Sequence, residues 1–105
     1  MRALVAIAVC LVAGSVEAAG QEPDVARGKA LVETNCGSCH GLGRSGASSH
    51  PQAPPFREVF EKYPPEMLAE ALAEGISTGH PDKPSFAAEP DEIAEIIAYL
   101  RTLVP

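Results

Sequence analysis

The segment Cys36-Gly-Ser-Cys39-His40 constrains this chain more than any other part of its 105 residues. Two thiols three positions apart, followed directly by an imidazole, form the C-x-x-C-H pattern by which c-type haem is attached to protein. Each thiol can bond to one vinyl group on the same edge of the porphyrin. The imidazole then lies where it can ligate the iron. The motif therefore predicts one haem c, held covalently through Cys36 and Cys39, with His40 as an axial ligand.

Other uses of the same residues explain the motif less well. A structural zinc site takes four ligands, and the remaining histidines, His50 and His80, are too far apart to complete a finger or ribbon. A redox-active C-x-x-C pair is typical of a chain with a βαβ pattern, and no such pattern is present in the sequence. A disulfide within the motif would leave the adjacent imidazole without a role. Haem attachment is the interpretation that uses all three side chains.

Residues 1–18 have the composition of a secretory signal peptide. Arg2 supplies one positive charge, an apolar run covers residues 3–13, and small residues end the segment at Ala18. The run is shorter than the ~20 apolar residues that span a bilayer, although an uncleaved N-terminal anchor is the alternative. We expect export to a bacterial periplasm, cleavage before a single domain at residues 19–105, and no membrane span after cleavage.

The charge of the chain argues against nucleic acid as a partner. The sequence has 14 acidic and 8 basic residues, for a net charge of −6. Residues 19–105 keep this charge, since the segment before them holds one acidic and one basic residue. Binding to phosphates requires a basic surface. A domain of this size also has a marginal core of its own, which a covalently held apolar ring would complete.

Helical periodicity predicts an all-α fold. Apolar residues recur at helical spacing over residues 24–32, 55–63, 66–75 and 90–104. Asp24 is a predicted N-cap and Gly75 a predicted stop signal. Two loops rich in glycine, serine and proline, residues 41–55 and 77–88, separate the helices. Loops of this length usually surround something, and the sequence shows no strand pattern.

With these features in place, residues 19–105 resemble a small class I cytochrome c. The resemblance is carried by Gly28–Leu31, Cys36–Gly41 and Ala98–Leu103. It implies a cytochrome c fold, in which three to five short helices wrap around one covalently bound haem. The resemblance also implies that a small residue on the first helix, Gly28, meets an aromatic residue on the last, Tyr99.

Two further features of the family concern the iron. A proline carbonyl after the haem motif accepts a hydrogen bond from the ligating histidine, and both Pro54 and Pro55 fit that role. The family's other axial ligand is usually a methionine in the loop before the last helix. The corresponding loop contains no methionine, and Lys83 stands where the methionine is expected.

The resemblance therefore leaves the second axial ligand open. Lys83 occupies the matching position, but an amine with an ordinary pKa of ~10.4 must lose its proton to coordinate. His80 is ordinarily neutral near pH 7, although its loop is expected to shift by several Å to present it. Met67 on the third helix and His50 in the first long loop are further candidates. The iron could also be open or water-bound on this face.

The resemblance implies an electron carrier whose iron cycles between Fe(II) and Fe(III), rather than an enzyme, either alone or as a subunit of an oxidoreductase complex. Its partners would be redox proteins, such as an oxidase, dehydrogenase or reductase subunit. No catalytic acid–base constellation stands out in the sequence. A second hypothesis is a five-coordinate haem c protein that binds small gaseous ligands or reduces peroxide. A third is a partner subunit in which the haem mainly supports folding.

Overall fold

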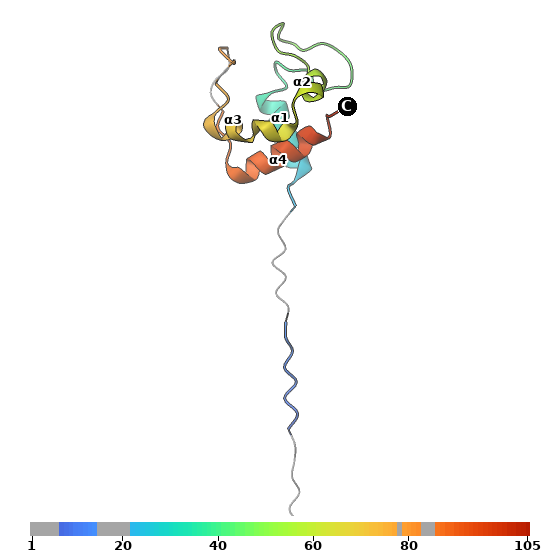
Figure 1. The fold of residues 1–105 in the computed structure, drawn as a ribbon, viewed down its shortest axis with the longest axis vertical. Coiled ribbons are helices and arrows are strands. Elements are labelled where there is room, and N and C mark those ends of the chain that lie inside the picture. The colour runs from blue at the N-terminus through green and yellow to red at the C-terminus, as the bar shows by residue number, and fades with distance from the viewer. Residues whose placement is uncertain (1–6, 15–21, 78, 83–85) are drawn as a thin grey trace, which may run out of the picture.

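The computed structural model describes residues 7–14, 22–77, 79–82 and 86–105. Within these ranges the chain forms helices and no strand, which confirms the all-α prediction (Figure 1). The elements in chain order are α1 (Val25–Asn35), α2 (Phe56–Lys62), the 3₁₀ turn η1 (Pro65–Leu68), α3 (Ala69–Glu74) and α4 (Pro90–Arg101). Among the described helices, none is both long and apolar enough to cross a membrane.

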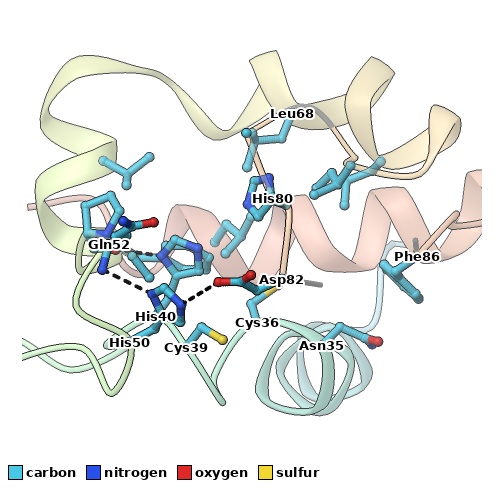
Figure 2. Close-up of a pocket in the computed structure, with 18 of the residues that line it drawn as sticks. Asn35, Cys36, Cys39, His40, His50, Gln52, Leu68, His80, Asp82 and Phe86 are labelled. Atoms are coloured by element: carbon cyan, nitrogen blue, oxygen red, sulfur yellow. Dashed lines mark hydrogen bonds and ion pairs between the residues drawn. The ribbon is translucent and has the colours of Figure 1, made fainter. Parts of the chain in front are cut away.

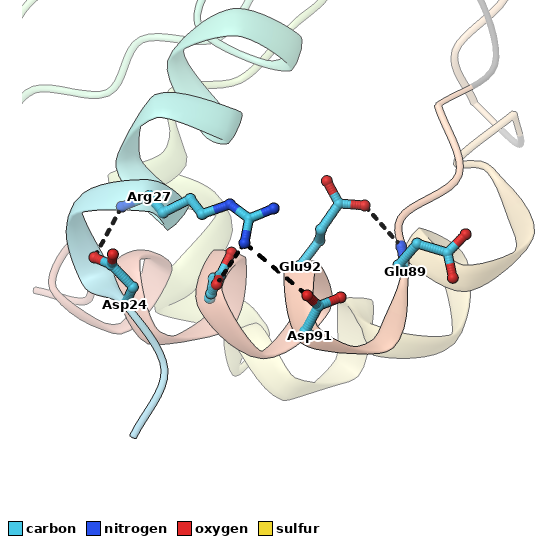
Figure 3. A network of polar contacts seen from close by, with 6 residues as sticks. Asp24, Arg27, Glu89, Asp91 and Glu92 are labelled. Carbon is cyan, nitrogen blue, oxygen red and sulfur yellow. Dashed lines mark hydrogen bonds and ion pairs between the residues drawn. The ribbon is translucent and has the colours of Figure 1, made fainter. Parts of the chain in front are cut away.

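Local signals set the ends of these helices. The Asp24 carboxylate accepts a hydrogen bond from the backbone N–H of Arg27 at 3.1 Å, as an N-cap does (Figure 3). At the start of α4, the Glu92 side chain accepts from the backbone N–H of Glu89, completing a capping box. Gly75 ends α3 in the left-handed region, with φ 115°, where glycine has no steric penalty.

The first and last helices cross at Gly28. A Cβ atom on this residue would lie 1.9 Å from the backbone oxygen of Glu95, so only glycine allows the two backbones to approach this closely. The three atoms nearest to such a Cβ belong to the backbone of Glu95 and Ile96, and the expected contact with Tyr99 stays a prediction. Tyr99 is half-buried one turn further on, where burial and then the charge of Glu33 on α1 raise its pKa.

Ion pairs reinforce the same crossing from the solvent side. The Arg27 guanidinium on α1 lies 3.3 Å from the Glu95 carboxylate and 4.0 Å from that of Asp91, both on α4 (Figure 3). The Glu95 side chain is only 10% exposed, whereas the other two are more than half exposed. The pair with Glu95 is therefore the less solvent-screened of the two contacts.

Buried apolar side chains from every helix except η1 meet in one core. Its members are Val32, Phe56, Phe60, Leu72, Ala88, Ile96 and Leu100. Two backbone hydrogen bonds join the two ends of the loop between α3 and α4 beside this core. There the backbone N–H of Phe86 donates to the Gly75 carbonyl at 3.2 Å, and that of Ala88 donates to the Leu72 carbonyl at 2.9 Å. These bonds return the chain to α4 beside the point where it left α3.

Candidate haem-binding site

The C-x-x-C-H motif forms a turn at the end of α1. The backbone N–H of Cys36 donates to the Val32 carbonyl at 2.8 Å, which extends the helical pattern by one residue. The N–H groups of Cys39 and His40 then both donate to the Cys36 carbonyl, at 3.1 and 2.9 Å. This turn brings the three side chains to the wall of one pocket, where all three are half-buried.

One hydrogen bond fixes the proton of the His40 ring. Its Nδ1 atom lies 2.7 Å from the carbonyl oxygen of Pro54. Because a carbonyl only accepts, Nδ1 must carry the proton, and in the neutral imidazole the lone pair is on Nε2. The Phe56 ring packs against the same imidazole, with ring centres 4.6 Å apart. Pro54, rather than Pro55, is thus the proline in contact with His40.

The pocket beside His40 suits a large, flat and mostly apolar group. Its volume is about 1230 Å³, counting the space at its open mouth. Apolar side chains from α2, α3, α4 and the adjoining loop form much of the wall, among them Val59, Leu72, Phe86, Ile96 and Leu100. A few polar groups interrupt this lining, which is the usual character of a cofactor site. The two thiols and the imidazole of the motif supply the donor set that covalent haem requires.

The structure brings His80 into the same pocket. Its ring centre lies 6.2 Å from that of His40, with the ring planes inclined at 51°. In Figure 2 His80 enters from the segment that leads toward α4, while His40 and both cysteines lie on the other side.

The structure bears differently on the other candidates for the second axial ligand. Lys83 lies outside the described residues, so its role stays a prediction. Met67, on η1, is 64% exposed and is not among the described residues that line the pocket. A methionine turned toward solvent does not reach an iron in the pocket.

His50 lines the pocket but has both ring nitrogens engaged. Nδ1 accepts the backbone N–H of Gln52 at 3.1 Å, so the proton of the neutral ring is on Nε2. Nε2 donates in turn to the Asp82 carboxylate at 3.1 Å (Figure 2). This arrangement leaves neither nitrogen for a metal. The contact also joins the two long loops, and the sequence carries no local signal for it because its partners are 32 positions apart.

Comparison with known proteins gives three matches. A family model described as "Cytochrome C oxidase, cbb3-type, subunit III" matches residues 23–100. Cytochrome c-552 of Bradyrhizobium diazoefficiens is 30% identical over 99 residues, which cover 92% of this chain and 93% of that protein. A cytochrome c-553-like protein of Synechocystis sp. is 29% identical over 80 residues, which cover 76% of this chain and 70% of its own. No solved structure matches.

Proposed function

Because this chain belongs to the c-type cytochromes, in the family described as cytochrome c oxidase, cbb3-type, subunit III, we propose that it carries electrons between periplasmic redox proteins. Haem c is the cofactor of this family and electron transport is its role. The observation that supports the proposal for this chain is the convergence of Cys36, Cys39 and His40 on one wall of an apolar pocket.

Each residue of the motif has a defined task in this proposal. Cys36 and Cys39 would hold the haem covalently, because the S–H group of a thiol can add across a vinyl C=C bond without an oxidant. His40 would hold the iron through Nε2, since its Nδ1 proton is donated to the Pro54 carbonyl. That hydrogen bond also fixes the ring orientation and raises the basicity of the ligand. The bound haem supplies an iron that accepts one electron and later returns it.

Two features support export and a protein partner. Apolar residues at 7–14 contribute nothing to the core, for Ile7 is 83% and Leu11 91% exposed, which suits a leader ending at residue 18. The domain at 19–105 keeps a net charge of −6, a charge that favours encounter with a basic surface. The partner would be an oxidase, dehydrogenase or reductase subunit, and the family's description favours a place in an oxidase complex.

One observation favours a second candidate function. With Met67 exposed, the described part of the chain offers no methionine to the pocket. An iron ligated by His40 alone would be five-coordinate and open to carbon monoxide, nitric oxide or peroxide. Lys83, at the position of the expected methionine, is a further proposed ligand that would close the site.

Replacing both cysteines of the motif tests the proposal. Cys36→Ala with Cys39→Ala should abolish covalent haem, measured as the pyridine haemochrome that survives acid–acetone extraction. The matched control is Cys10→Ala, within the proposed leader, which should keep the full amount of haem. Extraction-resistant haem in the double variant would contradict the attachment. Rapid carbon monoxide binding to the reduced wild type would favour the five-coordinate function.

A further inference from the structure

We propose that His80 is the second axial ligand of the iron, and that the contact between His50 and Asp82 holds its loop in place. The inference rests on the proposed function, since it presumes a haem ligated by His40. It goes further by assigning the other face of the iron to an imidazole from the loop between α3 and α4.

The separation of the two imidazoles fits one metal ion between them. A histidine nitrogen binds a metal at about 2.0–2.1 Å. Since a ring nitrogen lies about 1.1 Å from the ring centre, two imidazoles on opposite sides of one metal have centres roughly 6.3 Å apart. The observed separation of His40 and His80 is 6.2 Å. Their inclination of 51° is also allowed, because each ring can rotate about its own metal–nitrogen bond.

The surroundings of His40 and His80 distinguish a metal-binding pair of imidazoles from two aromatic rings that only pack against each other. Aromatic rings packed in a core also have centres 4.5–7 Å apart, so the distance alone does not decide. His40, however, packs its ring on Phe56 at 4.6 Å, and its contact with His80 is longer. Both imidazoles line the same largely apolar pocket, together with the cysteines that would hold the porphyrin. Convergence of a few polar groups in an apolar pocket is typical of a ligand site.

The backbone conformation at the start of the loop directs the chain toward the pocket. After Gly75 the chain continues through Ile76 at φ 46°, a left-handed conformation that a β-branched residue rarely adopts. The side chain of Ile76 lines the pocket, so this unusual backbone accompanies a contact with the site. A turn follows, in which the N–H of His80 donates to the Ser77 carbonyl at 3.2 Å.

The middle of this loop, just after His80, is bonded to the opposite side of the pocket. Asp82, two residues after His80, accepts from His50 Nε2 at 3.1 Å. His50 is itself held, since its backbone N–H donates to the Cys39 carbonyl at 3.1 Å and its Nδ1 accepts from Gln52. The motif that would carry the haem and the loop that carries His80 are thus linked through two hydrogen bonds. His50 and Asp82 act as positioning residues and do not touch the iron.

The wild-type holoprotein provides the first test. Protein labelled with ¹⁵N only in histidine would be studied in the ferric state by pulsed electron paramagnetic resonance. A low-spin iron coupled to two imidazole nitrogens is the expected result. Coupling to a single imidazole, or a high-spin iron, would overturn the inference. The pyridine haemochrome of the same sample distinguishes failure of the ligand assignment from failure of the proposed function. Its absence would refute the proposed function itself.

Variants of the loop provide the second test. His80→Ala should convert the ferric spectrum from low-spin to high-spin, and added imidazole should restore it. His80→Met should raise the reduction potential, since thioether ligation favours ferrous iron. Lys83→Ala should leave the low-spin spectrum unchanged. A high-spin spectrum in Lys83→Ala, or an unchanged one in His80→Ala, would assign the ligand to Lys83 or elsewhere.

The positioning role of Asp82 predicts a kinetic effect. Asp82→Asn should accelerate the binding of cyanide to the ferric protein several-fold, because the loop then leaves the iron more often. The matched control is Asp91→Asn, at the start of α4 and outside the lining of the pocket, which should bind cyanide at the wild-type rate. Equal rates in Asp82→Asn and the wild type would show that the contact does not position His80.

Discussion

The two histidines on the motif side of the pocket carry their protons on different nitrogens. His40 is protonated on Nδ1 because it faces the Pro54 carbonyl, and His50 on Nε2 because its Nδ1 faces the Gln52 N–H. Backbone groups therefore place the proton of the neutral ring on a different nitrogen in each of the two imidazoles. The sequence shows both residues as histidine, and only the fold separates their chemistry.

A second residue whose ionisation depends on its neighbours is Glu66, at the start of η1. Its own backbone N–H lowers its pKa most, the Arg101 side chain lowers it further, and a desolvation effect opposes them. In Arg101→Ala the pKa should rise toward the ordinary value, followed by NMR titration of the Glu66 carboxyl carbon. By linkage, the contact stabilises the fold above the ordinary pKa, and this contribution is lost as pH falls through the lowered one.

The matched control for this titration removes a different arginine. Arg44 lies exposed in the loop after the haem motif, in a part of the chain remote from η1. Arg44→Ala should leave the Glu66 titration unchanged. An equal shift in both variants would mean that overall charge, rather than the contact with Arg101, sets the pKa.

At the scale of the elements, the crossing of α1 and α4 depends on the missing side chain of Gly28. Gly28→Ala should destabilise the holoprotein by about 1–3 kcal/mol through overpacking, reduced by the ~1 kcal/mol that alanine gains in a helix. A new Cβ would meet backbone atoms of Glu95, which cannot rotate away as a side chain would. The unfolding midpoint in guanidinium chloride measures the effect.

Gly41→Ala is the control, since it adds the same methyl group without the close contact. A Cβ at Gly41 would lie 3.5 Å from its nearest neighbours, an ordinary van der Waals distance. We expect its unfolding midpoint to stay near the wild-type value. A Gly28→Ala protein as stable as this control would show that the helices can separate at the crossing without cost.

The sequence predicted the helices well because their signals are local. Asp24, Gly75 and Pro90 mark helix ends through capping and backbone preference alone, and all three lie where the prediction placed them. The third predicted helix is divided, since Pro65–Leu68 form the 3₁₀ turn η1 before α3 begins. The boundary between these two helix types depends on packing that periodicity does not report.

Contacts between residues far apart in the chain could not be predicted from the sequence. The motif identified Cys36, Cys39 and His40, but the choice of Pro54 over Pro55 depends on how the first long loop returns to the pocket. The position of His80 depends likewise on the closed base of its loop, where Gly75 and Phe86 meet. Such pairings link residues with no shared local pattern, so only the folded chain reveals them.

For the whole molecule, the pocket is as important as the packed core. The described core contains seven buried apolar side chains, and the pocket beside it is lined largely by apolar side chains as well. Small domains bury a smaller fraction of their surface than large ones, so their own cores are marginal. A haem that fills this pocket would become part of the core. It would add the buried apolar surface that a chain of this size lacks.

The N-terminal segment leads to a prediction for the exported protein. The large apolar residues within the described part of this segment, 7–14, are exposed rather than packed on the domain, so removal of the segment should not disturb the fold. We expect the purified periplasmic protein to begin at Ala19 and to carry one haem, both measured by intact mass. Ala18→Phe should block cleavage, because a large side chain does not fit the small-residue site. A wild-type protein that retains residues 1–18 would instead support the N-terminal anchor.

The crossing of α1 and α4 also orders events in time. Its ion pair joins Arg27 to Glu95, 68 positions apart, so the crossing cannot form until nearly all of the chain is present. In a chain that leaves the cytoplasm from its N-terminus, Cys36 and Cys39 emerge well before α4. The thiols are then accessible while the chain is still unfolded, and closure of the terminal helices comes last. If the chain is exported from its N-terminus, as we propose, this order leaves an interval in which the cofactor can be attached before the crossing closes.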